Sequence, residues 1–377
     1  MSENASVIVF PSIFAQNKIN SLISNIKKIL KIKNLKFQAI RKEDPIIVVD
    51  ANDPVFTSSA INLLFGIERV AIAKQVENEF NTVVSAITKI GSNLLLKGDK
   101  FYVKIEGYST GYLPKDLEIA TTSSLIEKTT KLGAKPGTEN NNDKVLYTFL
   151  TKKHAYVCIY TDKGLGGIPY NSQNEKIVCS IFDELSAISC LETIKQGYDV
   201  KIVIFYNKKS ELLNLVKILN KIIPRTLHSK IDLDFYQILI SSGTKNFLLL
   251  VQTITEILIT IAKLNKMKKI SLSISPLIFP SPFVDTIIKR VFEKNIIPHI
   301  PLAGLDDDIL DNAKEIGLGK FLPKIEKFGK MKFNSINTTI NEAKKIAKES
   351  EHTKKSISIE VGANNIHDIL DSLELEH

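Results

Sequence analysis

From about residue 176 onward, apolar β-rich runs alternate with helical stretches, and this alternation limits the possible folds more than any other feature of the chain. Strands are expected at 201–205, 231–240, 270–274, 296–301 and 356–361. Helices are expected at 246–264, 283–293, 308–316, 337–350 and 366–373, together with one that Ser210 is expected to cap. Strands that alternate with helices favour a parallel, doubly wound sheet. We therefore predict an α/β domain over residues 176–377.

The first 170 residues show a different order of elements. A strand at 6–10, a helix at 17–31, a strand at 45–49 and a helix near 58–64 predict a small α+β domain over residues 1–75. A helix at 81–96, a strand at 100–105 and a hairpin of 147–150 with 155–160 predict a second domain over residues 76–170. The hairpin is joined at Lys152-Lys153-His154, and the polar segment 133–143 is expected to be a mobile loop.

Charge and cysteine content restrict the compartment and the partners. Lysine and arginine outnumber aspartate and glutamate by 50 to 41, and a net charge of +9 suits an anionic partner. Three cysteines make no disulfide framework, and the N-terminus lacks a signal-peptide pattern, so we expect a cytoplasmic protein. The apolar stretch 246–264 contains Gln252, Glu256 and Lys263, which predicts a buried helix and no membrane association.

Several short segments resemble, in one order along the chain, the tRNA 4-thiouridine synthetases (tRNA sulfurtransferases). They are Tyr102-Val103-Lys104-Ile105, Asp116-Leu117-Glu118, Ala155-Tyr156-Val157, Gly164-Leu165-Gly166-Gly167-Ile168-Pro169, Gly197-Tyr198-Asp199-Val200 and the turn Pro301-Leu302-Ala303-Gly304-Leu305-Asp306. The resemblance implies a ferredoxin-like N-terminal unit, a THUMP domain and a PP-loop ATP-pyrophosphatase domain. On the residues alone, the glycine-rich segment is also explained as a turn between domains.

The resemblance also shows where this chain departs from the family. The family's Ser-Gly-Gly-x-Asp-Ser loop, which cradles ATP phosphates, aligns with Ile181-Phe182-Asp183-Glu184-Leu185-Ser186. Only Ser186 matches. Phe182 and Asp183 replace both glycines, and Leu185 replaces the acidic residue. Because apolar side chains offer phosphate no compensating donors, we expect a degenerate loop without ATP or another cofactor.

Other features of the family's chemistry are also missing. The family's reactive cysteine lies beyond the Pro301 turn, and this chain has no cysteine after Cys190. The family's Gly-Glu pair falls near Ser273 and Ile274. Cys179 and Cys190 are expected to be small buried residues, and the histidines lack metal-ligand spacing. We therefore expect no catalytic residue and no metal, although an enzyme remains an open alternative.

Positive charge in the first 170 residues carries the RNA-binding hypothesis. The resemblance implies that the first two domains grip the tRNA acceptor end through phosphate and sugar contacts, and Lys104 occupies a basic strand position of that kind. Glu106, Gly107 and Ile119 stand where the family favours basic residues. Phosphate contacts depend on local positive potential more than on exact spacing. The other candidate contacts are Lys115, Lys144, Lys152 and Lys153, with Lys27, Lys28 and Lys31 on the first helix, and solvated surface lysines are the alternative.

These observations favour a non-catalytic tRNA-binding protein that engages the acceptor region or assists an active thiolation enzyme. One alternative is an enzyme of different chemistry on the same scaffold. Another is a structural or homodimerising subunit without an RNA role.

Overall fold

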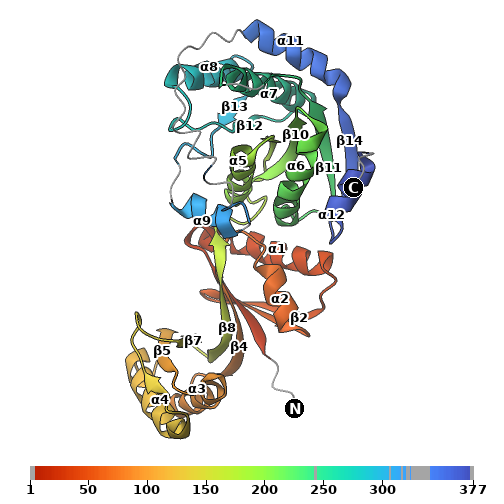
Figure 1. The fold of residues 1–377 in the computed structure, drawn as a ribbon. Coiled ribbons are helices and arrows are strands. Elements are labelled where there is room, and N and C mark those ends of the chain that lie inside the picture. The colour runs from red at the N-terminus through yellow and green to blue at the C-terminus, as the bar shows by residue number, and fades with distance from the viewer. Residues whose placement is uncertain are drawn as a thin grey trace. The chain divides into compact units, whose positions relative to one another are not determined.

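The computed structural model describes residues 5–241, 244–304, 307–315, 317–319, 323 and 340–373. The chain divides into Met1–Gly166 (unit 1) and Gly167–His377 (unit 2), whose elements are labelled in Figure 1. Each unit is built on one sheet with packed helices, so the expected mixed α/β class is confirmed. The expected division at residue 75 falls inside a strand, and one sheet continues across it, so the three-domain division remains a prediction.

Unit 1 contains an eight-stranded sheet in the order β2-β3-β1-β4-β8-β7-β5-β6. The strands are β1 (Ser6–Pro11), β2 (Phe37–Glu43), β3 (Ile46–Ala51), β4 (Ile67–Glu77), β5 (Lys100–Gly107), β6 (Lys135–Pro136), β7 (Lys144–Leu150) and β8 (His154–Gly166). The helices are η1 (Ile13–Lys18), α1 (Ile19–Ile32), α2 (Pro54–Ile61), α3 (Phe80–Leu94), α4 (Pro114–Lys128) and η2 (Thr130–Leu132). Most neighbours are antiparallel, but β5 runs parallel to β6 and β7.

The sheet of unit 1 has a packed core on each face. On one face, α3 and α4 cover a cluster that includes Phe101, Val103 and Val157. On the other, Phe10 of β1 reaches Phe149 of β7, with ring centroids 5.2 Å apart, although two strands separate β1 from β7. The sheet therefore curls strongly, and the long pair β4 and β8 forms its spine (Figure 1).

Three of the longer elements of unit 1 were not anticipated from the sequence: β2, β4 and α4. The short η1 and η2 were not anticipated either, nor was β6, which lies in the segment 133–143 that was expected to be a loop. β4 mixes alanines with Glu68, Arg69 and Lys74, so it carries no clear apolar alternation. α4 buries only Leu117, Thr121 and Leu125, too few for an apolar stripe. Both are specified by their neighbours: β4 pairs with β8 from Ile67 to Glu77 and with β1 as far as Ala73, and α4 places Leu117 and Leu125 in the core cluster that it shares with α3 and β5.

Unit 2 contains a six-stranded sheet in the order β13-β12-β9-β10-β11-β14. The strands are β9 (Lys176–Ile181), β10 (Asp199–Tyr206), β11 (Lys230–Gln237), β12 (Lys269–Ser271), β13 (Ile297–His299) and β14 (Lys355–Glu360). The helices are α5 (Glu184–Lys195), α6 (Lys209–Ile222), η3 (Ile223–Arg225), α7 (Thr244–Leu264), α8 (Ser281–Phe292), α9 (Asp307–Glu315), α11 (Ile340–Ser350), η5 (Glu351–Thr353) and α12 (Asn365–Ser372).

The sheet of unit 2 is parallel except for β14, which joins β11 in the antiparallel direction. Helices α5, α6 and α12 pack together, and α7 packs with α8 and α11 (Figure 1). This is the doubly wound arrangement that the alternation predicts. The expected cap at Ser210 was wrong. Helix α6 begins at Lys209, so Ser210 lies inside its first turn and the N-cap is Lys208. There, the Glu211 carboxylate accepts hydrogen bonds from the N–H groups of Asn207 and Lys208.

Helix α7 is the element whose composition could be mistaken for a membrane span. The stretch Asn246–Leu264 is long and apolar enough to cross a bilayer, but 67% of its most apolar window is buried inside the unit. Its Glu256 binds Arg290 of α8 through two hydrogen bonds of 2.6 and 2.8 Å. The burial and the ion pair are typical of a core helix, as expected from the sequence.

A cluster at the start of β10 predicts how unit 2 responds to acid. Burial raises the pKa of Asp199, but hydrogen bonds from His228 and Tyr170 and the charge of Lys176 outweigh it, so the pKa falls to about 2. A carboxyl with a lowered folded-state pKa stabilises the fold above its unfolded pKa of about 4, and this contribution is lost as the pH falls toward 2. We expect Asp199→Asn to lower the free energy of unfolding by about 2 kcal/mol at pH 7, and by much less at pH 2.

Urea denaturation of both proteins at a series of pH values measures this difference. Asp285→Asn, on the exposed surface of α8, is the control and is expected to change stability little at any pH. An Asp199→Asn deficit that stays constant from pH 7 to pH 2 would contradict the assigned role of the carboxylate.

Candidate functional site

The chain crosses from one side of the unit 2 sheet to the other next to β9. From β9 it proceeds to β10 and β11 on one side, and later to β12 and β13 on the other. Open α/β sheets bind ligands beyond the carboxyl ends of their strands at such a switch point. Here that edge is formed by β9 and β12, which are neighbours. The segment Ile181–Ser186 lies there, between the end of β9 and the first turn of α5.

This segment uses its own hydrogen-bond donors. Ser186 Oγ accepts from the N–H groups of Phe182 and Asp183, each at 2.9 Å, and donates to the carbonyl of Asp183 at 2.8 Å. The Asp183 carboxylate caps α5 by accepting from the Ser186 N–H at 2.8 Å. A phosphate bound at a helix N-terminus needs those N–H groups. In this conformation, Phe182, Asp183 and Ser186 do not offer theirs to a ligand.

Apolar side chains anchor the same segment in the core. Ile181 and Leu185 are fully buried. The Phe182 ring lies 6.5 Å from that of Phe247, which stacks on Phe279 at 5.9 Å. Ile181, Phe182 and Leu185 therefore act as packing residues, and removing their side chains would leave a cavity.

The other positions linked to catalysis are also buried in unit 2. Ser273, near which the resemblance places the family's Gly-Glu pair, lies with its Oγ 3.2 Å from Ser180 Oγ of β9. Cys179 and Cys190 are both buried, and a hydrogen bond with Cys179, followed by burial, raises the pKa of Cys190 well above its usual value. A protonated, buried thiol is a poor nucleophile. Leu305 and Asp306, in the turn after Pro301, lie outside the described residues.

In unit 1, two of the lysines expected to contact RNA are engaged by acids. Lys104 Nζ lies 3.3 Å from Glu106 and 3.2 Å from Glu139, and Lys115 Nζ lies 3.0 Å from Glu118. Each of these ion pairs reduces the positive potential that a phosphate would meet. Lys104 and Lys115 remain candidate contacts, although a phosphate would have to compete with their carboxylates.

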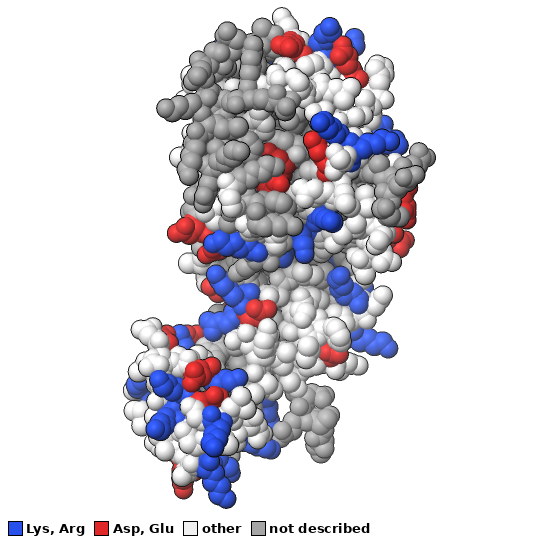
Figure 2. Space-filling view, viewed as in Figure 1, with Lys and Arg blue, Asp and Glu red and all other residues white. Residues whose placement is uncertain are grey.

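The remaining candidate lysines are exposed but do not form one cluster. Lys27, Lys28 and Lys31 lie on α1, Lys144 begins β7, and Lys152 and Lys153 form the β7–β8 turn. The two ends of β7 are roughly 20 Å apart, given the rise of a strand. Figure 2 shows acidic side chains interspersed with basic ones on the visible face. Lys152 and Lys153 are adjacent in the turn, as Lys27 and Lys28 are on α1.

Beside Lys104, a hollow of about 430 Å³ opens on unit 1. It is lined by three basic residues, three acidic residues and four others: Arg69, Lys104, Lys163, Glu68, Glu139, Asp162, Tyr102, Val145, Tyr147 and Thr161. Aromatic rings beside cationic groups can stack on bases and contact phosphates of a single strand. Arg69 is not among the residues predicted from the sequence, because β4 carries no clear apolar alternation.

Arg69 lines this hollow, and Glu106 contacts two other lining side chains, Lys104 and Tyr147. The Arg69 guanidinium lies over the rings of Tyr147, at 4.5 Å, and Phe10, at 5.0 Å. Tyr147 donates a hydrogen bond of 2.7 Å to Glu106. Burial raises the pKa of Glu106, but Tyr147 and Lys104 lower it further, so the carboxyl stays ionised well below neutral pH. The ionised Glu106 thus holds two of the cationic side chains, Arg69 and Lys104, by ion pairs of 3.8 and 3.3 Å.

No protein-family model matches the chain. The chain is similar to the probable tRNA sulfurtransferases of Methanosarcina mazei (22% identity over 159 residues) and Methanosarcina acetivorans (23% over 163 residues). Each match covers 42% of this chain and only 39% and 38% of the relatives, so the chain spans about two fifths of their length.

Solved structures share the fold over a larger part of the chain. A 4-thiouridine synthetase in complex with RNA and bound ATP matches with a TM-score of 0.66 and 14% identity, over 95% of this chain and all of that one. PH1313 from Pyrococcus horikoshii matches with a TM-score of 0.59 and 18% identity, over 83% of this chain and all of that one. The fold is therefore that of the 4-thiouridine synthetase structure. In sequence, the chain resembles tRNA sulfurtransferases.

The described residues contain no group of three or more histidine, cysteine, aspartate or glutamate side chains placed to hold a metal ion.

Proposed function

We propose that this chain is a cytoplasmic tRNA-binding protein that uses the 4-thiouridine synthetase scaffold without its ATP-dependent chemistry. It engages the acceptor region of tRNA, or assists an active thiolation enzyme, and works without ATP or another cofactor. The observation that carries the proposal is the segment Ile181–Ser186, in which the N–H groups of Phe182, Asp183 and Ser186 are hydrogen-bonded within the segment. In this proposal the segment is a degenerate PP-loop.

The RNA-binding half of the proposal is supported by unit 1. It carries exposed lysines on α1 and on the β7–β8 turn, and a hollow that combines tyrosine rings with cationic groups. The two curated relatives are named tRNA sulfurtransferases, and the solved synthetase was crystallised with RNA. Binding dominated by phosphate contacts would require neither a sharp motif nor a catalytic residue.

Filter binding of the full chain to total tRNA at several salt concentrations tests the proposal. If about four lysines each neutralise a phosphate, the logarithm of the binding constant is expected to fall with a slope of about −3 to −4 against the logarithm of salt concentration. Magnesium-dependent ATP binding would instead favour an enzyme of altered chemistry. Binding of neither ligand would favour a structural subunit, whose homodimer light scattering would detect.

A further inference from the structure

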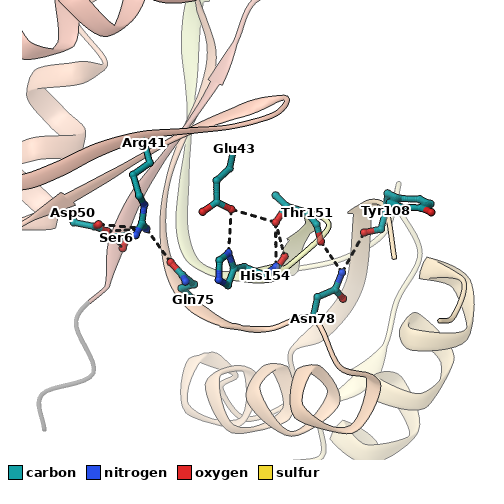
Figure 3. A network of polar contacts seen from close by, with 9 residues as sticks. All are labelled: Ser6, Arg41, Glu43, Asp50, Gln75, Asn78, Tyr108, Thr151 and His154. Atoms are coloured by element: carbon teal, nitrogen blue, oxygen red, sulfur yellow. Dashed lines mark hydrogen bonds and ion pairs between the residues drawn. The ribbon is translucent and has the colours of Figure 1, made fainter. Parts of the chain in front are cut away.

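A polar network joins two hairpins of unit 1 that are far apart in sequence (Figure 3). Glu43 is the last residue of β2, and its Oε2 lies 3.3 Å from Thr151 Oγ1 and 3.2 Å from His154 Nδ1. Thr151 and His154 flank the β7–β8 turn, 108 and 111 positions away along the chain. One carboxylate oxygen thus contacts both ends of the turn that carries Lys152 and Lys153.

The turn is closed by its own hydrogen bonds. Thr151 N–H donates to the His154 carbonyl at 2.8 Å, and His154 N–H donates to Thr151 Oγ1 at 3.2 Å. Thr151 is buried, whereas Lys152 and Lys153 are exposed. The two lysines therefore project from a base that Glu43 holds on one side.

Asn78, just after β4, holds the other side of the base. Its side-chain amide donates to the carbonyls of Thr151, at 2.7 Å, and Tyr108, at 3.2 Å, and its N–H donates to the Lys153 carbonyl at 3.0 Å. Gly107 has a φ of +98°, and a Cβ there would lie 2.1 Å from the Leu150 carbonyl oxygen. Strands β5 and β7 can therefore approach closely beneath the turn.

Glu43 is a negative charge beside the turn that carries Lys152 and Lys153, so its effect on phosphate binding needs an explanation. Its side chain is only 19% exposed, and burial raises its pKa, but Tyr156 and His154 lower it further, so the carboxyl is ionised at neutral pH. The nearby Arg41 binds Asp50 and Gln75. A carboxylate this close to two lysines weakens phosphate binding by Coulomb repulsion unless it contributes in another way. Holding the turn is such a contribution.

We propose that Glu43 is a positioning residue for RNA binding, which fixes the β7–β8 turn so that Lys152 and Lys153 meet phosphates without first being ordered. The inference rests on the proposed function, because it assigns part of the RNA-binding surface. Ordering a loop and its long side chains upon binding reduces affinity, so a turn that is already ordered binds more tightly.

The sign of the effect of Glu43→Ala on tRNA affinity distinguishes this role from simple electrostatics. Removing a negative charge near a phosphate site on its own raises affinity. Loss of positioning is expected to lower affinity roughly tenfold, and to speed hydrogen exchange at the amides of Thr151 and Asn78. Glu43→Gln, which keeps an acceptor for Thr151, is expected to bind within about twofold of the unaltered protein.

Glu77→Ala is the matched control. Glu77 is exposed and pairs with His154 across β4 and β8, so its removal changes the same charge near the same turn. It is expected to leave tRNA affinity unchanged or to raise it. Filter binding at one fixed salt concentration compares the four proteins, and circular dichroism confirms that each is folded.

If the Glu43→Ala variant binds tRNA as tightly as the unaltered protein, or more tightly, the positioning role is overturned and the proposed function stays intact. An unaltered protein that binds no tRNA would overturn the proposed function itself, and the inference with it. If Glu43→Ala does not fold, Thr151→Val and Thr151→Ser replace it. The valine variant is expected to bind more weakly than the serine variant, and equal affinities would refute the proposal.

Discussion

Replacing Phe182 and Asp183 together by glycine is expected to lower the melting temperature of unit 2 by roughly 10 °C. The Phe182 ring packs on Phe247, and removing a packed aromatic ring costs about 3 kcal/mol or more. Loss of the Asp183 cap on α5 costs about 1 kcal/mol more. For a domain of this size, each kcal/mol corresponds to about 2–4 °C. Differential scanning calorimetry measures the shift.

Asp183→Asn is the control for the cap. Asparagine also accepts a hydrogen bond at an N-cap, so we expect this variant to melt within about 2 °C of the unaltered protein. A glycine variant as stable as the unaltered protein would show that the two side chains contribute little to packing.

Neither the unaltered protein nor the glycine variant is expected to produce 4-thiouridine. Glycine at both positions makes the loop of the variant flexible. We expect this variant to bind ATP at most weakly. Leu185, Ser273 and Ile274 remain, and no cysteine follows Cys190. Titration calorimetry with magnesium and ATP, and nucleoside analysis of tRNA incubated with ATP and a persulfide donor, are the measurements. Micromolar ATP binding by the unaltered protein, or 4-thiouridine formed by the variant, would contradict the proposed loss of chemistry.

Replacing Lys152 and Lys153 by alanine is expected to weaken tRNA binding about 40-fold at 0.1 M salt. Two lost phosphate contacts make the slope of log K against log salt concentration less steep by about 1.6. Since 0.1 M lies one power of ten below the 1 M reference, the binding constant at 0.1 M falls by about 10 to the power 1.6, or roughly 40-fold. Because phosphate contacts carry no sequence information, different tRNAs are expected to lose affinity alike. Filter binding over a salt series measures both quantities.

The adjacent pair Lys344 and Lys345 provides a charge-matched control, since both side chains are exposed on α11 of unit 2. Their replacement by alanine changes the net charge equally, and is expected to change tRNA affinity less than threefold. Equal losses in the two double variants would mean that binding depends on net charge and not on the β7–β8 turn.

The elements that the sequence predicted correctly are those whose pattern is local. The strands of unit 2 are short apolar runs, and helices such as α1 and α6 carry an apolar stripe at helical spacing, so each element is recognisable from its own residues. The importance of the segment Ile181–Ser186 followed from its alignment with the family's loop. The hydrogen bonds that close the segment did not, because they depend on the rotamers of Ser186 and Asp183.

The sequence by itself determined the doubly wound class of unit 2, the hairpin that carries Lys152 and Lys153, and the presence of Phe182 and Asp183 in the segment that the resemblance aligns with the family's loop. These features depend on residue type and on neighbours within a few positions. The tertiary structure alone decided that β4 is the spine of unit 1, that Lys104 is engaged by Glu139, and that Glu43 holds the lysine turn. The physical reason is that these side chains, 35 to 111 positions apart along the chain, meet only when the strands assemble into the curled sheet. The pattern of neighbouring residues does not predict such contacts.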